Sequence, residues 1–367
     1  MKKETKIQGK SPNIFVGHTN YPKVNVGYLL TQKYDHHDEP TFFAKNKFSI
    51  PQIITKRQQL LNSTIKANIK DPNNSLLDSA KLIAKSSNPV DSEIKIKNLK
   101  GSFTTDAIAM PFGPSAELQS IQLTENIKMN PFIEKLTSDT DVKAKTALEE
   151  LSKKNIDEHQ LTKLLSIGTL GKNPKLVPTK WSITAVDDTI GLNKYEDILD
   201  FPQIDFGVRV GQYLGNKYVI CFLPGAYSYE FIEIIYPHTK HNSTDEFKIE
   251  SDYEFTNGRK EYASETAGGY YASRLPILQY LFSKRKQGRV IVFRCITDDY
   301  TTPLGVWVVR EGVRESLKHN VKEISEEDVK KVVLHFLKKY DMSQPEKAIK
   351  QSVLLREEQK SIKSWFT

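Results

Sequence analysis

The change in residue pattern near residue 175 constrains the fold more than any other feature of this 367-residue chain. Before it, apolar residues recur at helical spacing, and we predict helices over 143–153 and 158–167, the second ended by Gly168. After it, runs rich in β-branched and aromatic residues predict strands. Helices and strands do not alternate regularly, so we predict an α+β (mixed α/β) fold with a helical amino-proximal half and a strand-rich later half.

The same patterns predict further elements. We predict strands over 14–16, 24–26, 181–186, 218–223, 229–235, 289–296 and 306–309, and helices over 53–69, 76–85, 272–285 and 325–340. Pro224-Gly225 predicts a hairpin turn between two of these strands. The chain beyond residue 345 is charged and repetitive. We therefore expect one globular domain over 11–345 and a flexible tail over 346–367.

Composition limits the class of protein. Hydrophobic residues make up 38% of the chain, enough for a core, and a net charge of +8 permits contact with phosphate backbones. The two cysteines, Cys221 and Cys295, lie in apolar runs, which predicts buried free thiols and excludes a disulfide framework or a cysteine zinc site. The start is polar and no apolar run has the length of a membrane span, so we expect a cytoplasmic, nucleoid-associated protein without membrane contact.

Several common catalytic motifs are absent from the sequence. It has no phosphate-binding loop ending in Gly-Lys-Ser or Gly-Lys-Thr, no His-Glu-x-x-His and no Gly-x-Ser-x-Gly. Residues 35–39 are of metal-ligand types, but consecutive residues rarely converge on one ion, which favours a solvated loop. We therefore predict no metal centre and no cofactor, with Mg²⁺ as the alternative considered next.

Two acidic pairs are candidates for chemistry. Asp187-Asp188 and Asp298-Asp299 each follow a predicted strand. Acidic pairs at strand ends can hold Mg²⁺ for phosphoryl transfer. Aspartates at such positions also commonly form turns that cap the next element. The sequence leaves both interpretations open.

Residues 267–274 combine two glycines, two tyrosines and an arginine at a helix entry. Gly268 and Gly269 would let backbone amides approach a phosphate at the helix N-terminus. Tyr270 would then stack on a base, and Arg274 would bind a phosphate. The alternative is a tight turn with packed tyrosines.

Residues 284–314 form the most basic stretch of the predicted domain. Arg294 and Arg310 lie within it, interleaved with aromatic side chains. Such a pattern is typical of a nucleic-acid groove, and equally of a solvated basic face. We retain both arginines as candidate nucleic-acid- or nucleotide-binding residues.

The C-terminal peptide carries the most specific pattern for a partner. Gln359, Ile362, Trp365 and Phe366 occupy positions one, four, seven and eight of the last nine residues. A single-turn helix places them on one side as an apolar plug. The spacing over 359–366 resembles the PIP motif, the PCNA-interacting peptide that DNA-replication and repair proteins insert into the sliding clamp. The alternative is a terminal helix that packs on its own domain.

From about residue 11 onward, the chain resembles the archaeal Nre family of DNA-repair proteins. The motifs that carry the resemblance are Val-Pro-Thr-Lys-Trp-Ser-Ile-Thr-Ala-Val-Asp-Asp-Thr-Ile-Gly at 177–191, Ala-Gly-Gly-Tyr-Tyr-Ala-Ser-Arg-Leu at 267–275, Pro-Leu-Gly-Val-Trp-Val-Val-Arg-Glu at 303–311, and the segment 16–27. We add Lys23 and Trp181, from these motifs, to the candidate nucleic-acid- or nucleotide-binding residues. The resemblance implies a damage-repair factor that docks on PCNA through its terminal peptide. Many relatives carry an amino-terminal cysteine zinc module, to which this sequence has no counterpart.

The main hypothesis is therefore a DNA-repair factor recruited to PCNA, with a domain that binds DNA or a nucleotide. The rival is a nucleic-acid- or nucleotide-processing enzyme that the same tail delivers to DNA. Its candidate residues lie near predicted turns or strand ends; they are His18, Asp187, Asp188, Arg274, Asp298 and Arg310. A third possibility is a scaffold whose basic face binds DNA without chemistry. The sequence leaves open whether the domain is catalytic, which lesion it recognises and its oligomeric state.

Overall fold

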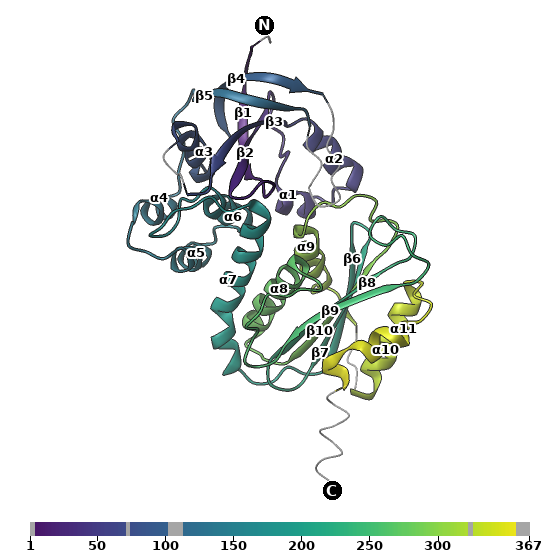
Figure 1. The fold of residues 1–367 in the computed structure, drawn as a ribbon. Helices are drawn as coiled ribbons and strands as arrows, with labels where there is room; N and C mark the ends of the chain where they lie inside the picture. The colour runs from purple at the N-terminus through teal and green to yellow at the C-terminus, as the bar shows by residue number, and fades with distance from the viewer. Residues whose placement is uncertain (1–3, 71–73, 102–112, 322–325, 357–367) are drawn as a thin grey trace. The chain divides into compact units, whose positions relative to one another are not determined.

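A computed structural model of the chain describes residues 4–70, 74–101, 113–321 and 326–356 (Figure 1). The α+β class is confirmed, but the chain divides into two compact units, residues 1–190 and 191–367. Each unit combines a sheet with several helices, so the expected contrast between a helical half and a strand-rich half is not observed. Each unit is described by itself below.

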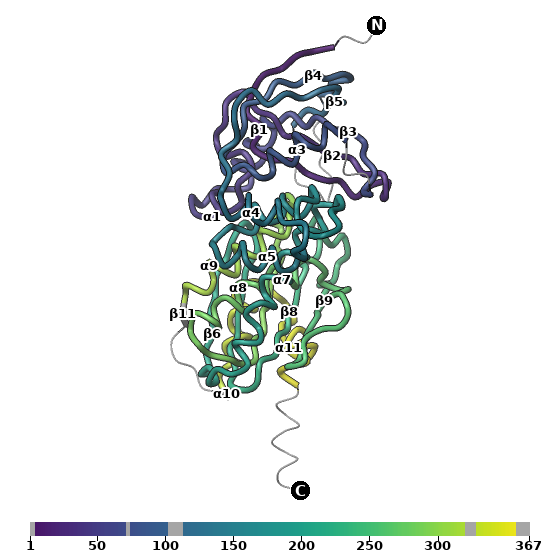
Figure 2. Tube along the Cα trace, turned by 90° about the vertical axis from the view of Figure 1, so that its left-hand side faces the viewer, coloured from purple at the N-terminus to yellow at the C-terminus, as the bar shows by residue number. Residues whose placement is uncertain are grey.

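The first unit is built around a closed β-barrel. In order around the barrel the strands are β1, β2, β3, β5 and β4, and β4 pairs with β1 to close it. All neighbours are antiparallel except β3 and β5. The strands are β1 (Thr5–Val16), β2 (Lys23–Thr31), β3 (Leu61–Asn68), β4 (Val90–Lys100) and β5 (Ser115–Leu123). Figure 2 follows the trace of these strands from a second direction.

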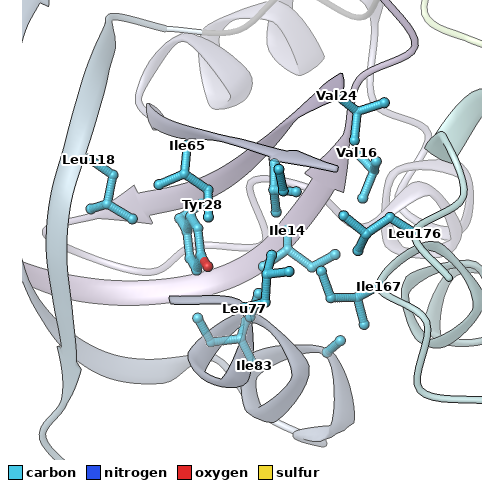
Figure 3. Close-up of a cluster of buried hydrophobic side chains, with 14 of the residues drawn as sticks. Ile14, Val16, Val24, Tyr28, Ile65, Leu77, Ile83, Leu118, Ile167 and Leu176 are labelled. Carbon is cyan, nitrogen blue, oxygen red and sulfur yellow. The ribbon is translucent and has the colours of Figure 1, made fainter. Parts of the chain in front are cut away.

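Alternate side chains along the barrel strands fill its interior, as the two-residue period of a strand requires (Figure 3). On β2, for example, Val24, Val26 and Tyr28 are fully buried. Helix α3 (Ser75–Lys85) packs against this core through Leu77, Ala80, Ile83 and Ala84, and the Asn74 side chain caps it by accepting a hydrogen bond from the Leu76 amide at 3.0 Å. The hydroxyl of Tyr28 donates to the carbonyl oxygen of Leu76, which ties the helix to the barrel.

Further helices complete the first unit, and the last of them crosses into the second. They are α1 (Pro40–Lys45), α2 (Ile50–Gln58), α4 (Pro131–Ser138), α5 (Ala144–Lys153), α6 (Glu158–Ser166) and α7 (Thr179–Leu199). The predicted helices over 143–153 and 158–167 correspond to α5 and α6. The predicted helix over 53–69 is wrong in its second half, because residues 61–68 form β3.

The second unit is a mixed sheet with the strand order β11, β6, β7, β10, β8, β9. Neighbouring strands are antiparallel except β8 and β10. The strands are β6 (Gly207–Tyr213), β7 (Asn216–Leu223), β8 (Ser228–Ile235), β9 (Lys248–Glu254), β10 (Arg289–Ile296) and β11 (Asn320–Val321). Because β10 lies between β7 and β8, Pro224-Gly225 does not close a hairpin, and that prediction is wrong.

Helices cover both faces of this sheet (Figure 1). Tyr218, Ile220 and Phe222 of β7 pack with α8 (Gly268–Lys284) and α9 (Trp307–Ser316). The intervening residues of the same strand pack with α10 (Glu326–Lys339) and α11 (Pro345–Gln351). From Tyr218 to Leu223 the strand is apolar or aromatic, because both of its faces are buried there. Cys221 and Cys295 lie in this sheet as buried free thiols, as predicted.

Two segments that were predicted as strands are helical. Residues 181–186 lie in α7, and residues 307–309 begin α9. Along α7 the buried side chains of Ser182, Val186 and Ile190 recur every four residues, which is a helical period. The run at the start of α9 is buried on all sides, and a short apolar run of that kind has no period that distinguishes a helix from a strand.

The expected flexible tail is ordered as far as residue 356. Leu354 and Leu355 are buried in the core between the sheet and α10. The carboxylate of Glu230 on β8 accepts hydrogen bonds from the Val353 amide at 2.8 Å, the Leu354 amide at 3.1 Å and the Ser352 hydroxyl at 2.6 Å. Residues 346–356 therefore belong to the second unit. The predicted clamp-binding residues, 359–366, lie outside the described residues.

The turn between β6 and β7 makes a testable demand on glycine. Gly215 has φ +74°, and a Cβ atom there would lie 2.2 Å from the backbone nitrogen of Tyr300. We expect Gly215→Ala to lower the free energy of unfolding by about 2 kcal/mol, as measured by urea denaturation. Gly258→Ala is the matched control, because Gly258 has φ +67° with nothing within 4 Å of its would-be Cβ. Equal losses in the two variants would show that backbone strain, and not the close approach, matters at Gly215.

Candidate nucleic-acid interface

Two aromatic side chains meet on the surface of the first unit. Tyr21 lies in the turn between β1 and β2, and Trp181 lies in the first turn of α7. They are 50% and 47% exposed, and their ring centroids are 5.2 Å apart at an interplanar angle of 55°. Residues 160 positions apart in the sequence thus form one exposed aromatic pair, which we call the Tyr21–Trp181 pair.

Hydrogen bonds fix the start of α7 against the barrel and so position Trp181. The Thr179 hydroxyl accepts from the Val16 amide at the end of β1 at 2.8 Å. The Ser166 hydroxyl, at the end of α6, lies 3.1 Å from the hydroxyls of both Thr179 and Ser182. Three segments therefore share one small polar junction. The small hydroxyl residues on either side of Trp181 hold the helix in place, and the indole remains at the surface.

The opposite partner of the pair is held by the turn that contains it. Asn20 adopts a left-handed conformation, with φ +64°, and its carbonyl oxygen accepts from the Lys23 amide at 2.9 Å. The Pro22 carbonyl accepts from the Ile69 amide at 3.1 Å, just beyond β3. His18 lies exposed in the same turn. The turn is therefore anchored to the barrel at both of its ends.

Exposed lysines lie near the Tyr21–Trp181 pair, either next to it in the sequence or on segments that are linked by hydrogen bonds to its turn. Lys23 is directly opposite Asn68, and Lys66 is one antiparallel step further along β3, opposite Asn25. Lys70 follows β3, and Lys175 precedes Leu176, whose amide donates to the Ile69 carbonyl at 3.2 Å. Lys180 adjoins Trp181. Within the part of the chain that the structure describes, none of these five lysines forms an ion pair with a carboxylate.

The glycines and tyrosine at the start of α8 do not form the phosphate cradle that the sequence suggested. A Cβ atom on Gly269 would lie 3.0 Å from Oε1 of Glu233, so a carboxylate already adjoins this helix end. Gly268 precedes it at the first position of the helix. The Tyr270 side chain is completely buried, which makes its ring inaccessible to a base. A negative group at this position opposes a second anion.

Arg274 and Arg294 are engaged in buried ion pairs. Nη1 of Arg274 donates to Oε2 of Glu254 at 2.7 Å, and the Tyr227 hydroxyl donates to the other oxygen of that carboxylate at 2.9 Å. Arg294 donates from Nη1 to Oε1 of Glu233. It also donates from Nε and Nη2 to Oδ1 of Asn216, at 2.9 and 2.7 Å. Both guanidinium groups are therefore part of the core of the second unit.

Burial determines the electrostatics of these pairs. It raises the pKa of the Glu233 carboxyl group, although the neighbouring Arg294 charge lowers that pKa. Arg294 faces Glu233 across the parallel pair and Tyr218 across the antiparallel pair, so the three side chains form a row on one face of the sheet. Burial also raises the pKa of the Tyr218 hydroxyl. Tyr218 therefore stays protonated at neutral pH, and the Arg294 charge opposes the effect of burial on the pKa of Glu233.

The remaining catalytic candidates are dispersed. Asp187 is buried and Asp188 half-buried, and both lie within α7, not at the end of a strand, which removes the reason for expecting Mg²⁺ there. Asp298 is exposed after β10, and Arg310 is buried on α9. Among the described residues, no three or more His, Cys, Asp or Glu side chains are grouped to hold a metal ion. No described helix is both long enough and apolar enough to span a membrane.

Sequence reasoning thus identified Trp181, Lys23 and His18 but missed their partner Tyr21 and the surrounding lysines. The segment 284–314 drew attention because its basic residues are consecutive in the sequence. The lysines near Trp181 come instead from four separate segments, and only strand pairing brings them together. The one local feature that marked Tyr21 was its place directly before a proline, in the predicted turn between two short strands.

The protein therefore consists of an N-terminal barrel unit with an exposed basic and aromatic surface, followed by a mixed sheet that is covered by helices. The chain belongs to the archaeal Nre family. The family model described as "Archaeal Nre, N-terminal" matches residues 1–242, and the one described as "Archaeal Nre, C-terminal" matches residues 254–365. The first match contains the Tyr21–Trp181 pair. The second contains Arg274 with its partner Glu254, and also Arg294, whose partner Glu233 lies in the first match.

Individual relatives agree with this assignment over most of their length. DNA repair protein NreA of Haloferax volcanii is 34% identical over 327 residues, which cover 84% of this chain and 77% of that protein. DNA repair proteins NreA and NreB of Archaeoglobus fulgidus are 35% and 32% identical, over 86% and 85% of this chain and 82% and 80% of their own lengths. No solved structure matches the chain.

Proposed function

We propose that this protein is a DNA-repair factor that contacts nucleic acid through its first unit and is recruited to the PCNA sliding clamp by its C-terminal peptide. The repair role is supported by the names of the relatives, three of which are DNA repair proteins that match at least four fifths of the chain. The nucleic-acid role is supported by one observation, the cluster of exposed lysines around the Tyr21–Trp181 pair. The clamp role is supported by the spacing of residues 359–366.

The lysine cluster fits a phosphate backbone for electrostatic reasons. Lysines without acidic partners leave a local excess of positive charge, which attracts an anion and releases its counterions on binding. Lys23 and Lys66 lie on adjacent strands with a diagonal offset, which places the two residues roughly 7–8 Å apart, close to the spacing of successive phosphates. Arg274 and Arg294 of the second unit are buried with carboxylates, so they contribute no comparable surface.

Removal of two of these lysines tests the proposal. We expect Lys23→Ala/Lys66→Ala to weaken binding to DNA at low salt about tenfold, and to reduce the slope of log affinity against log salt by about 2. Fluorescence anisotropy of a labelled oligonucleotide, titrated at several salt concentrations, measures both quantities.

The matched control removes two lysines that have acidic partners. Lys145 lies 3.9 Å from Glu149 and Lys153 lies 3.0 Å from Glu150, all on α5 of the same unit. Lys145→Ala/Lys153→Ala removes the same formal charge and is expected to leave the salt slope nearly unchanged. A similar loss in both double variants would mean that net charge, not this surface, binds DNA.

A further inference from the structure

The Tyr21–Trp181 pair leaves two large aromatic side chains at the surface of the first unit. Each side chain is about half exposed, although both are large and apolar. The two rings are inclined by 55° and are not stacked on each other, so their faces are not mutually covered. Hydrogen bonds hold the two segments that carry the rings: the Thr179 hydroxyl accepts from the Val16 amide, and the Pro22 carbonyl accepts from the Ile69 amide. Exposed aromatic rings can stack on the flat face of a ligand such as a base.

The lysines identify the chemistry of that partner. Lys23 follows Tyr21 by two residues, and Lys180 directly precedes Trp181. The positive charge continues along the barrel through Lys66, Lys70 and Lys175. A ligand with flat aromatic faces and a repeated negative charge matches both features. Nucleic acid has that composition, and every base offers a π-face for stacking regardless of its identity.

The accessibility of the bases decides between duplex and single strand. In a duplex each base is stacked between its neighbours, so only its edges are exposed in the grooves. Without unstacking a duplex, a tyrosine and a tryptophan on a barrel surface reach base faces only where the bases are unpaired. We infer that the Tyr21–Trp181 pair binds single-stranded nucleic acid by stacking on unpaired bases, while the adjoining lysines contact the backbone. This inference rests on the nucleic-acid contact proposed above, to which it adds the form of the substrate.

Two aromatic substitutions test the inference in the full-length protein. We expect Trp181→Ala and Tyr21→Ala each to weaken binding to a labelled oligo(dT) at least fivefold, with little change in binding to a duplex of equal length. Trp181→Phe should retain most of the affinity, because it keeps a ring that stacks. Circular dichroism and the thermal midpoint establish that each variant is folded.

The matched control is another exposed ring of the same unit. Phe132 on α4 is 44% exposed and has the ammonium group of Lys154 4.8 Å from its ring centroid. Phe132→Ala is expected to leave both single-strand and duplex binding unchanged. Equal losses for Phe132→Ala and Trp181→Ala would overturn the inference.

Further binding experiments distinguish RNA from DNA as the ligand, and they distinguish a failure of this inference from a failure of the proposed function. Oligo(rU) distinguishes RNA from DNA, and stacking-dependent binding of either supports the inference. A mononucleotide that displaces oligo(dT) at equal molar concentration would overturn the assignment to a polymer strand. Binding of duplex and single strand that depends on Lys23 and Lys66 but not on Trp181 would overturn this inference alone. No binding of any nucleic acid by the wild-type protein would overturn the proposed function as well.

Discussion

Replacing Trp365 and Phe366 together by alanine is expected to reduce affinity for PCNA at least 30-fold. Aromatic anchors that enter a pocket dominate an interface of this kind, and the loss of one typically costs 2 kcal/mol or more, roughly 30-fold. The peptide itself must become ordered on binding, so little other affinity remains to compensate. Isothermal titration of the full-length protein into an archaeal PCNA measures the change.

Two controls give this experiment its specificity. Lys360→Ala and Lys363→Ala lie between the anchor positions of the same peptide and should change affinity by less than about fivefold, since rim charges contribute little. A chain that ends at Arg356 keeps all the residues of the second unit's core that the structure describes, and it should lose clamp binding entirely. If the double alanine variant kept wild-type affinity, another part of the protein would have to bind the clamp.

Arg294→Met is expected to cost about 3–5 kcal/mol of folding stability at pH 7.5. The substitution leaves the Glu233 carboxylate buried without its guanidinium partner, and it removes two hydrogen bonds to Asn216. Urea denaturation of the purified variant measures the loss. Arg289→Met on the same strand is the matched substitution: Arg289 is only half-buried and donates to the Pro224 carbonyl at 3.1 Å, so we expect a loss of about 1 kcal/mol.

The pH dependence of that loss has a definite sign. Burial raises the pKa of Glu233 in the folded protein, and removal of the Arg294 charge raises it further. A carboxyl group whose folded pKa exceeds its unfolded pKa of about 4.3 stabilises the fold at low pH, and that contribution is lost as the pH rises through the folded pKa. The deficit of Arg294→Met relative to wild type should therefore be smaller at pH 5 than at pH 7.5.

A second substitution at the carboxyl group checks the cause. Arg294→Met/Glu233→Gln removes the charge that the single variant leaves buried, so we expect it to recover much of the lost stability and to lose the excess pH dependence. A deficit that is independent of pH in Arg294→Met would place the cost in packing or in the Asn216 hydrogen bonds.

Several elements of the fold were predictable because their pattern is local. The runs at 218–223, 229–235 and 289–296 are strands, and the spacing of apolar residues predicted α3, α5 and α6 almost to the residue. The buried state of the two thiols followed from the apolar runs that contain them. The local pattern predicted the wrong element where apolar residues fitted both the strand period and the helix period, as at 181–186. It also did so where neither period was visible, as at the start of α9.

The candidate site divides in the same way. Trp181 and Lys23, which the motifs suggested, are at the surface. Tyr270 and Arg274, which were expected to contact a base and a phosphate, are buried in the core. A tyrosine and an arginine at a helix entry have the same composition whether they face a ligand or a core. The difference between a ligand site and a core depends here on Glu254 of β9 and Glu233 of β8, which pack near the helix start. The sequence of the helix contains no information about these two residues.

The sequence by itself determined the α+β class, the identity and approximate bounds of its strongly periodic elements, and the spacing of the terminal peptide, because each depends on residues within one or two turns of one another. Only the tertiary structure decided that β10 inserts between β7 and β8, that five strands of the first unit close into a barrel, and that Tyr21 meets Trp181. These depend on contacts between distant segments. Their free energy comes from the burial of complete surfaces, which no local period encodes.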